Sequence, residues 1–114
     1  MYETFDEVCG LKSVEDKWVQ PFIKRLKERY SLQSVILFGS RAQNRNNSWS
    51  DYDIFIESDD FKGMKPWERM ESVMELWQGD RPIEPICLTS EELLSNNSFF
   101  IRSILETGLK INLT

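Results

Sequence analysis

The chain has 114 residues, a formal net charge of −5 and 40% hydrophobic residues. This length suits one folded unit with its own core, so we expect a single domain over residues 1–114. There is no histidine, which excludes Ser-His-Asp and Cys-His catalytic machinery and histidine-based metal sites. The two cysteines, Cys9 and Cys87, are too few for a disulfide scaffold or a zinc cluster, and we expect reduced thiols.

Charge and hydropathy exclude further classes of protein. The net negative charge argues against duplex DNA or RNA as the main partner, because those ligands require basic surfaces. It leaves open a nucleotide whose phosphates are held by a metal ion and the backbone. No apolar run approaches the ~18 residues of a membrane span. The acidic residues 1–7 lack the apolar core of a secretory signal, so we expect a cytoplasmic protein with no membrane partner.

The first half of the sequence predicts one helix and two strands. Residues 14–30 carry an apolar stripe at helical spacing. Pro21 then requires either a kink or a helix that starts near Val19. Residues 34–38 and 51–57 are rich in β-branched and aromatic residues, which is typical of strands.

The second half predicts two longer helices and a third strand. Residues 66–78 are expected to form a helix with Pro66 in its first position. Its predicted apolar, core-facing side consists of Trp67, Met70, Val73, Met74 and Trp77. Residues 82–88 are expected to form a strand, and residues 98–107 a helix closed by Gly108.

Two short elements complete the expected order. Thr89 and Glu92 have the spacing of a capping box that opens a brief helix. The tail LKINL is compatible with a further strand. The alternation of helices and strands predicts an α/β (α+β) fold, in which a small mixed β-sheet is flanked by helices.

Two aspartates stand out on the second predicted strand. Asp51 and Asp53 are two residues apart, so their carboxylates are expected on the same face, with Cα atoms roughly 6.5–7 Å apart. Like charges held this close require a cation or a shared proton. Their hard oxygen atoms suit Mg²⁺, which takes its remaining ligands from water and substrate phosphates. Alone, the pair is more typical of exposed acids at the start of a strand than of a metal site.

A glycine and a serine end the first predicted strand. Gly39 lets the backbone approach a ligand closely, and the turn through Ser40 to Arg41 could present N–H groups to an anion. This is not a P-loop, because the chain lacks the GxxxxGK[ST] pattern. An ordinary strand-to-helix turn explains the dipeptide alone. Beside an acid pair, however, a phosphate cradle indicates phosphoryl or nucleotidyl transfer, which depends on positioning and charge neutralisation.

A third carboxylate could complete such a site as a metal ligand or as a base for an attacking hydroxyl. Glu84, in the third predicted strand, is the candidate, and a solvated acid between prolines is the alternative. Glu57 and Asp80 are weaker candidates for the same role.

The segment FGSRA…SDYDIFIE resembles the signature of the DNA polymerase β-like nucleotidyltransferase superfamily: Gly-Ser, a variable loop, then Asp-hydrophobic-Asp. The length and the order of elements are most similar to the minimal nucleotidyltransferases of prokaryotes. The resemblance implies Mg²⁺-dependent transfer of a nucleoside monophosphate from a nucleoside triphosphate, with ATP as the expected donor.

The resemblance also implies roles for individual residues. Gly39 and Ser40 would hold the triphosphate, and Asp51 and Asp53 would bind the metal. Glu84 would stand at the position of the third acid. Arg41, which adjoins the cradle, and Ser50, which precedes the acid pair, are further candidates for nucleotide binding.

Two positions differ from the family pattern. Asn44 replaces a second glycine that often follows the first, although Asn tolerates a positive φ better than most residues. Glu84 replaces an aspartate in a plain apolar strand, and it lies between Pro82 and Pro85. Because proline cannot donate to a β-ladder, this strand is expected at a sheet edge or in an irregular form.

The resemblance implies a partner as well. Minimal nucleotidyltransferases of this kind are often encoded beside a helical HEPN ribonuclease toxin, and they act as its antitoxin, in some systems by adenylylating a tyrosine. We therefore expect a hetero-oligomer with a helical HEPN-type protein. Two alternatives remain: a catalytically degenerate antitoxin that neutralises its partner by binding only, and a small-molecule nucleotidyltransferase.

Overall fold

The computed structural model describes residues 17–39 and 51–113. The helices of this part are α3 (Val19–Arg29), η1 (Asp59–Phe61, a 3₁₀ turn), α4 (Pro66–Met74), α5 (Ser90–Ser95) and α6 (Phe99–Thr107). Its strands are β1 (Ser34–Phe38), β2 (Tyr52–Glu57), β3 (Ile83–Leu88) and β4 (Leu109–Lys110).

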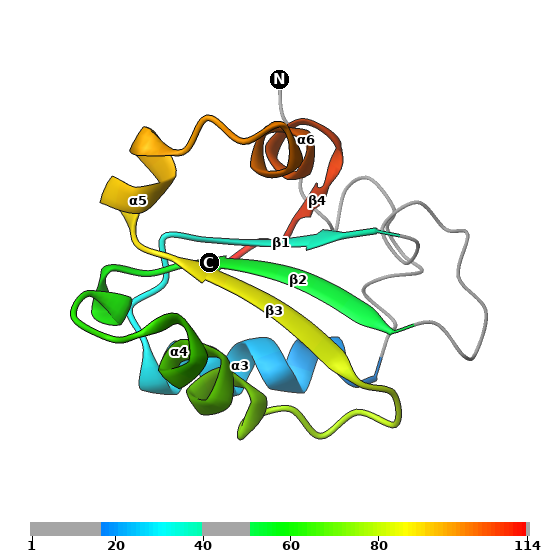
Figure 1. Cartoon of the computed structure of the whole chain (residues 1–114). Coiled ribbons are helices and arrows are strands. Elements are labelled where there is room, and N and C mark those ends of the chain that lie inside the picture. Colours follow the sequence, from blue (N-terminus) through cyan, green and yellow to red (C-terminus); the bar gives the residue numbers. More distant parts are fainter. Residues whose placement is uncertain (1–16, 40–50, 114) are drawn as a thin grey trace.

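The four strands form one mixed sheet in the order β3-β2-β1-β4. Strand β1 pairs antiparallel with both β2 and β4, whereas β2 and β3 are parallel. Helices α3 and α4 cover one face of the sheet, and α5 and α6 lie over the other (Figure 1). The predicted fold class, a small mixed sheet flanked by helices, is therefore confirmed.

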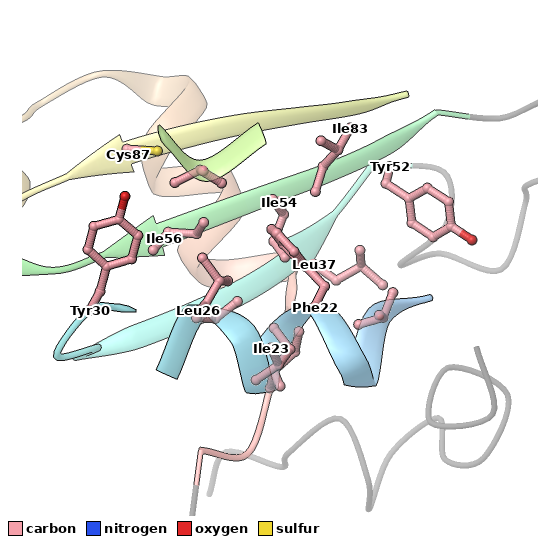
Figure 2. Packing of buried hydrophobic residues seen from close by; sticks show 14 of the residues in the cluster. Phe22, Ile23, Leu26, Tyr30, Leu37, Tyr52, Ile54, Ile56, Ile83 and Cys87 are labelled. Carbon is pink, nitrogen blue, oxygen red and sulfur yellow. The ribbon is translucent and has the colours of Figure 1, made fainter. Parts of the chain in front are cut away.

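The main core lies between the sheet and helix α3. Phe22 and Leu26 of α3 are fully buried against the sheet (Figure 2). They pack against alternate residues of the two central strands: Val35, Leu37, Tyr52, Ile54 and Ile56. This alternation follows from the two-residue period of a strand, and it sends the intervening residues to the opposite face.

That opposite face carries a smaller cluster under helix α6. Ile36 of β1 and Phe55 of β2 pack there against Ile101 and Ile104 of α6. Asp53 and Glu57 alternate in phase with Phe55, so both acids belong to the α6 side of the sheet.

Helix α3 begins at Val19, which confirms the second of the two expectations for this segment. Pro21 is then the third residue of the helix. The first backbone N–H groups of a helix have no acceptor within it, so proline is tolerated in this turn without a kink. Residues 14–16 lie outside the described residues.

Helix α4 corrects the predicted extent and core-facing side of residues 66–78. The helix ends at Met74, and its buried residues are Arg69 and Val73. Trp67, predicted to be buried, is 63% exposed, and Met70 and Met74 are also exposed. Trp77 lies beyond the helix, where its ring contacts Phe22 and Tyr52. Val73 and Trp77 of the predicted side therefore do pack in the core, and Arg69, which periodicity placed outside that side, is buried as well.

The remaining predicted elements are confirmed. Strand β3 lies at an edge of the sheet, as its prolines indicated. Helix α5 begins with the Thr89–Glu92 capping box, and Gly108 caps α6. Cys87 is buried with a free thiol, whereas Cys9 lies outside the described residues. Within the described ranges, no helix has the length and apolar character needed to cross a membrane.

Candidate functional site

Three residues from three strands form one row across the sheet. Phe38 of β1 is paired with Asp53 of β2, and Asp53 is paired with Glu84 of β3. Paired residues share a face, so all three side chains belong to the α6 side. The row lies where β1 ends and where β2 and β3 begin. Two of the three predicted acids are thus brought together by strand register.

Gly39 follows this row directly and touches its central acid. Its φ of +78° lies in the left-handed region, which favours glycine. A Cβ atom built on Gly39 would collide with the Oδ2 atom of Asp53. Two features therefore favour glycine at this position: the left-handed backbone conformation and the close approach of the Asp53 carboxylate.

The third acid, Asp51, stands just before β2 and is half-buried. Burial, with the negative charges of Glu84 and Asp51, raises the pKa of the Asp53 carboxyl above its usual range. In the described residues, no basic side chain forms an ion pair with Asp53. The three predicted acids thus share one electrostatic environment, in which the charges that act on Asp53 from the described residues are negative.

A shallow pocket of about 180 Å³ adjoins the row on the α6 side. It is lined by Phe38 and Gly39 from the sheet and by Phe100, Ser103, Ile104 and Thr107 from α6. The rings of Phe38 and Phe100 meet edge to face, with their centroids 5.9 Å apart. Sequence reasoning did not find this pocket, because it depends on how α6 crosses the end of β1.

Three predicted nucleotide-binding residues, Ser40, Arg41 and Ser50, lie outside the described residues. Their roles remain predictions. The two weaker candidates for the third acid are described. Glu57 lies at the far end of β2, where its carboxylate accepts hydrogen bonds from Ser34 and Ser90 at 2.8 and 2.7 Å. This separation removes Glu57 from the site. Asp80 is exposed and precedes β3.

The donor set suits a hard cation, although it is not a preformed cage. Nowhere in residues 17–39 or 51–113 do three or more acidic or cysteine side chains converge on a position that could hold a metal ion. Mg²⁺, however, commonly uses one or two carboxylates and takes its other ligands from water and phosphate oxygens. Asp51 and Asp53 supply two such carboxylates, and a cation would relieve the repulsion at Asp53.

Sequence reasoning also missed a structural ion pair elsewhere. Arg69 is buried and forms hydrogen bonds to both carboxylate oxygens of Glu92, at 2.6 and 3.0 Å. It also donates to the backbone carbonyls of Met64 and Cys87. No local sequence signal marks this arginine, because its partners come from other elements. Its hydrogen bonds connect α4 with β3 and α5, and we therefore assign Arg69 a structural role and no role at the row of acids.

A family comparison decides the kind of protein to which this geometry belongs. A sequence model described as the nucleotidyltransferase domain matches residues 19–111. The chain belongs to this nucleotidyltransferase domain family. The match spans every described helix and strand, and the protein is therefore a transferase by family. Comparison with curated proteins gave no match.

A solved structure supports the same assignment. It is the 1.40 Å crystal structure of a Sulfolobus solfataricus protein assigned as a nucleotidyltransferase. The two are 28% identical in sequence, with a TM-score of 0.52, over 62% of this chain and 63% of that protein. The chain therefore spans less than two thirds of the length of that protein, and the likeness concerns the shared nucleotidyltransferase fold.

Proposed function

We propose that this nucleotidyltransferase domain is a single unit over residues 1–114 that transfers AMP from ATP to a hydroxyl group with Mg²⁺. One observation carries the proposal: the row of Asp53 and Glu84 beside Gly39, with Asp51 close enough to affect its charge. Electrostatic positioning of this kind is the main requirement of phosphoryl and nucleotidyl transfer.

In the proposed reaction, Asp51 and Asp53 hold Mg²⁺, and the backbone at Gly39 and Ser40 holds the triphosphate. The bound Mg²⁺ supplies positive charge that offsets the charge of the phosphates. The acceptor oxygen forms a bond to the α-phosphorus, and the bond from that phosphorus to the β-phosphate bridging oxygen breaks. Glu84 takes the acceptor proton, and pyrophosphate leaves. Arg41 and Ser50 add contacts to the nucleotide.

We propose further that the acceptor is a tyrosine hydroxyl of a helical HEPN-type toxin, that the two proteins form a hetero-oligomer in the cytoplasm, and that transfer makes this chain an antitoxin. The family resemblance supports this partner. The acceptor would approach along the pocket lined by Phe38 and Phe100.

The test is transfer of label from α-labelled ATP to protein in the presence of Mg²⁺, with and without the co-encoded partner. Asp51→Asn and Asp53→Asn should each reduce transfer by at least about 100-fold, since each removes a carboxylate that holds the metal. Glu28→Gln, an exposed acid on α3, is the matched control and should transfer normally. Label on a small molecule instead of protein would mean that the acceptor is a small molecule and not a tyrosine of a partner. Normal transfer by both aspartate variants would refute the site.

Metal binding is tested without any turnover. Mg²⁺ should raise the melting temperature of the wild-type chain, because a ligand that binds only the native state stabilises it. The same titration should leave the Asp53→Asn variant unchanged. An equal rise in both proteins would place the metal elsewhere.

A binding-only antitoxin is the second candidate, and the exposure of Glu84 at the sheet edge favours it. The double variant Asp51→Asn/Asp53→Asn distinguishes the two functions in a toxin-neutralisation assay. Neutralisation that survives the double variant indicates contact alone. Neutralisation that is lost, while the variant still binds the toxin, indicates chemistry.

A further inference from the structure

Helix α4 presents an apolar face to solvent. We call the α4 apolar face the three residues Trp67, Met70 and Met74, which are 63%, 42% and 46% exposed. Their spacing of three and four residues places them along one side of the helix. Together with Glu71 and Glu75 they line an open groove of about 540 Å³. Contiguous exposed apolar surface of this kind marks interaction sites in soluble proteins.

Packing among the described residues does not account for this face. The helix already buries a different side, through Val73 and the guanidinium of Arg69. Tryptophan and methionine are typical of surfaces that bind other proteins, because they offer large or adaptable apolar contact. The α4 apolar face is thus a second apolar side of one short helix, beyond what the core requires.

The charged residues that line the groove are both acidic, and two cations lie nearby. Glu75 forms an exposed ion pair with Arg29 at 3.0 Å. Glu71 forms no ion pair with any residue that the structure describes. The amino group of Lys65 lies 5.2 Å from the centroid of the Trp67 ring, so this indole already accepts one cation. Of the two carboxylates that line the groove, Glu75 thus has a cationic partner and Glu71 has none among the described residues, so Glu71 is the group that attracts positive charge beside the apolar contact.

These charges argue against several occupants. A second copy would pair through the same patch across a two-fold axis and would bring Glu71 and Glu75 toward their own equivalents. Residues 1–16 contain five acidic residues and one basic residue, so they would be repelled as well. Nucleic acid and anionic membranes carry the same sign of charge.

We propose that the α4 apolar face is a docking site for an amphipathic helix of a partner protein, whose apolar stripe is bordered by lysine or arginine. Apolar side chains of that helix enter the groove, and its basic border meets Glu71. Because α4 lies on the sheet face opposite to α6, such a partner leaves the row of Asp53 and Glu84 open (Figure 1). The proposal does not depend on nucleotidyl transfer.

The experiment uses two synthetic peptides with the full-length chain. Both are 18-residue amphipathic helices with the same leucine stripe; one has lysines along its borders and the other has glutamates. Binding is followed by the anisotropy of a fluorophore on the peptide at physiological ionic strength. The lysine peptide should bind at least tenfold more tightly than the glutamate peptide. Equal binding, or no binding of the lysine peptide, would overturn the proposal.

Variants of the chain then locate the contact. Trp67→Ala and Met70→Glu should each weaken binding of the lysine peptide at least tenfold, and Glu71→Gln should weaken it several-fold. Phe99→Ala is the matched control, because Phe99 is an 82% exposed aromatic residue on α6. An equal loss in Phe99→Ala would mean unspecific attraction and would refute the assignment. Sedimentation that shows a dimer lost in Trp67→Ala would make a second copy the occupant and would refute it too.

Discussion

The two ends of the β2–β3 pair hold carboxylates in opposite electrostatic states. At the far end, Glu57 accepts hydrogen bonds from two serine hydroxyls, and Glu92 is held by Arg69 and by the backbone N–H of Thr89. The hydrogen bonds from Arg69 and Thr89 lower the pKa of Glu92 to about 2. At the near end, burial and the neighbouring acids raise the pKa of Asp53.

This difference separates acids that stabilise the fold from the acids to which we assign the proposed reaction. Glu57 and Asp53 share one strand and one face, about 13 Å apart at ~3.3 Å per residue. Sequence alone offered both as candidates. Among the described residues, Glu57 has hydrogen-bond donors, whereas the charges that act on Asp53 are like charges, which is the arrangement expected where a cation is to be bound.

The largest expected effect on stability is at the far end. Arg69→Met should lower the free energy of unfolding by about 3 kcal/mol, because it leaves Glu92, the buried carbonyl of Cys87 and the partly buried carbonyl of Met64 without their donor. Urea unfolding measures this loss. Arg102→Met, an exposed arginine on α6, is the control and should change the free energy by less than about 0.5 kcal/mol. Similar losses in both variants would mean that the Arg69 network does not stabilise the far end.

The next effect tests the near end through its glycine. Gly39→Ala should lower the free energy of unfolding by about 1–2 kcal/mol from its positive φ, and it should also abolish nucleotidyl transfer by displacing Asp53. Gly63→Ala is the matched control. Gly63 has a φ of +85° with no atom within 4 Å of an added Cβ. Gly63→Ala should lower the free energy of unfolding by a similar amount and leave nucleotidyl transfer intact. Loss of transfer in both variants would mean that strain, rather than the contact with Asp53, is responsible.

A pH titration sharpens the contrast at Glu92. The folded-state pKa of Glu92 is lowered from 4.5 to about 2, so its contribution is present above pH 4.5 and is lost as the pH falls toward 2. Glu92→Gln should therefore cost about 1 kcal/mol near pH 7, because the pair is partly exposed, and progressively less as the pH falls through about 2. The neighbouring exposed variant Glu91→Gln should show no such profile. A pH-independent cost would assign the effect to packing instead of charge.

The smallest effect has the opposite sign. Asp53→Asn should raise the free energy of unfolding at pH 7 in metal-free buffer, by less than about 1 kcal/mol, since it removes a carboxylate whose ionised form is disfavoured. Thermal unfolding in the presence of a chelator measures the gain. A clear loss of stability would mean that Asp53 is held by favourable contacts, as Glu57 is, and the comparison between the two ends would fail.

Local pattern predicted much of the fold. The strands at residues 34–38 and 82–88, the capping box of α5 and the glycine that ends α6 follow from residue types over short windows. These features depend on backbone preference and hydrogen bonding within a few residues, which the sequence states directly. Helix α4 shows the limit: its periodicity gave an apolar side, but Trp67 on that side is exposed and Arg69 is buried.

The sequence by itself determined the family signature, the order of elements and the pair Asp51 and Asp53. Only the tertiary structure placed Glu84 beside Asp53 and sent Glu57 to the far end, because strand register sets which distant residues meet. It also decided that Gly39 touches a carboxylate and that the α4 apolar face stays open. These outcomes depend on packing between elements far apart in the chain, and no short window of sequence contains them.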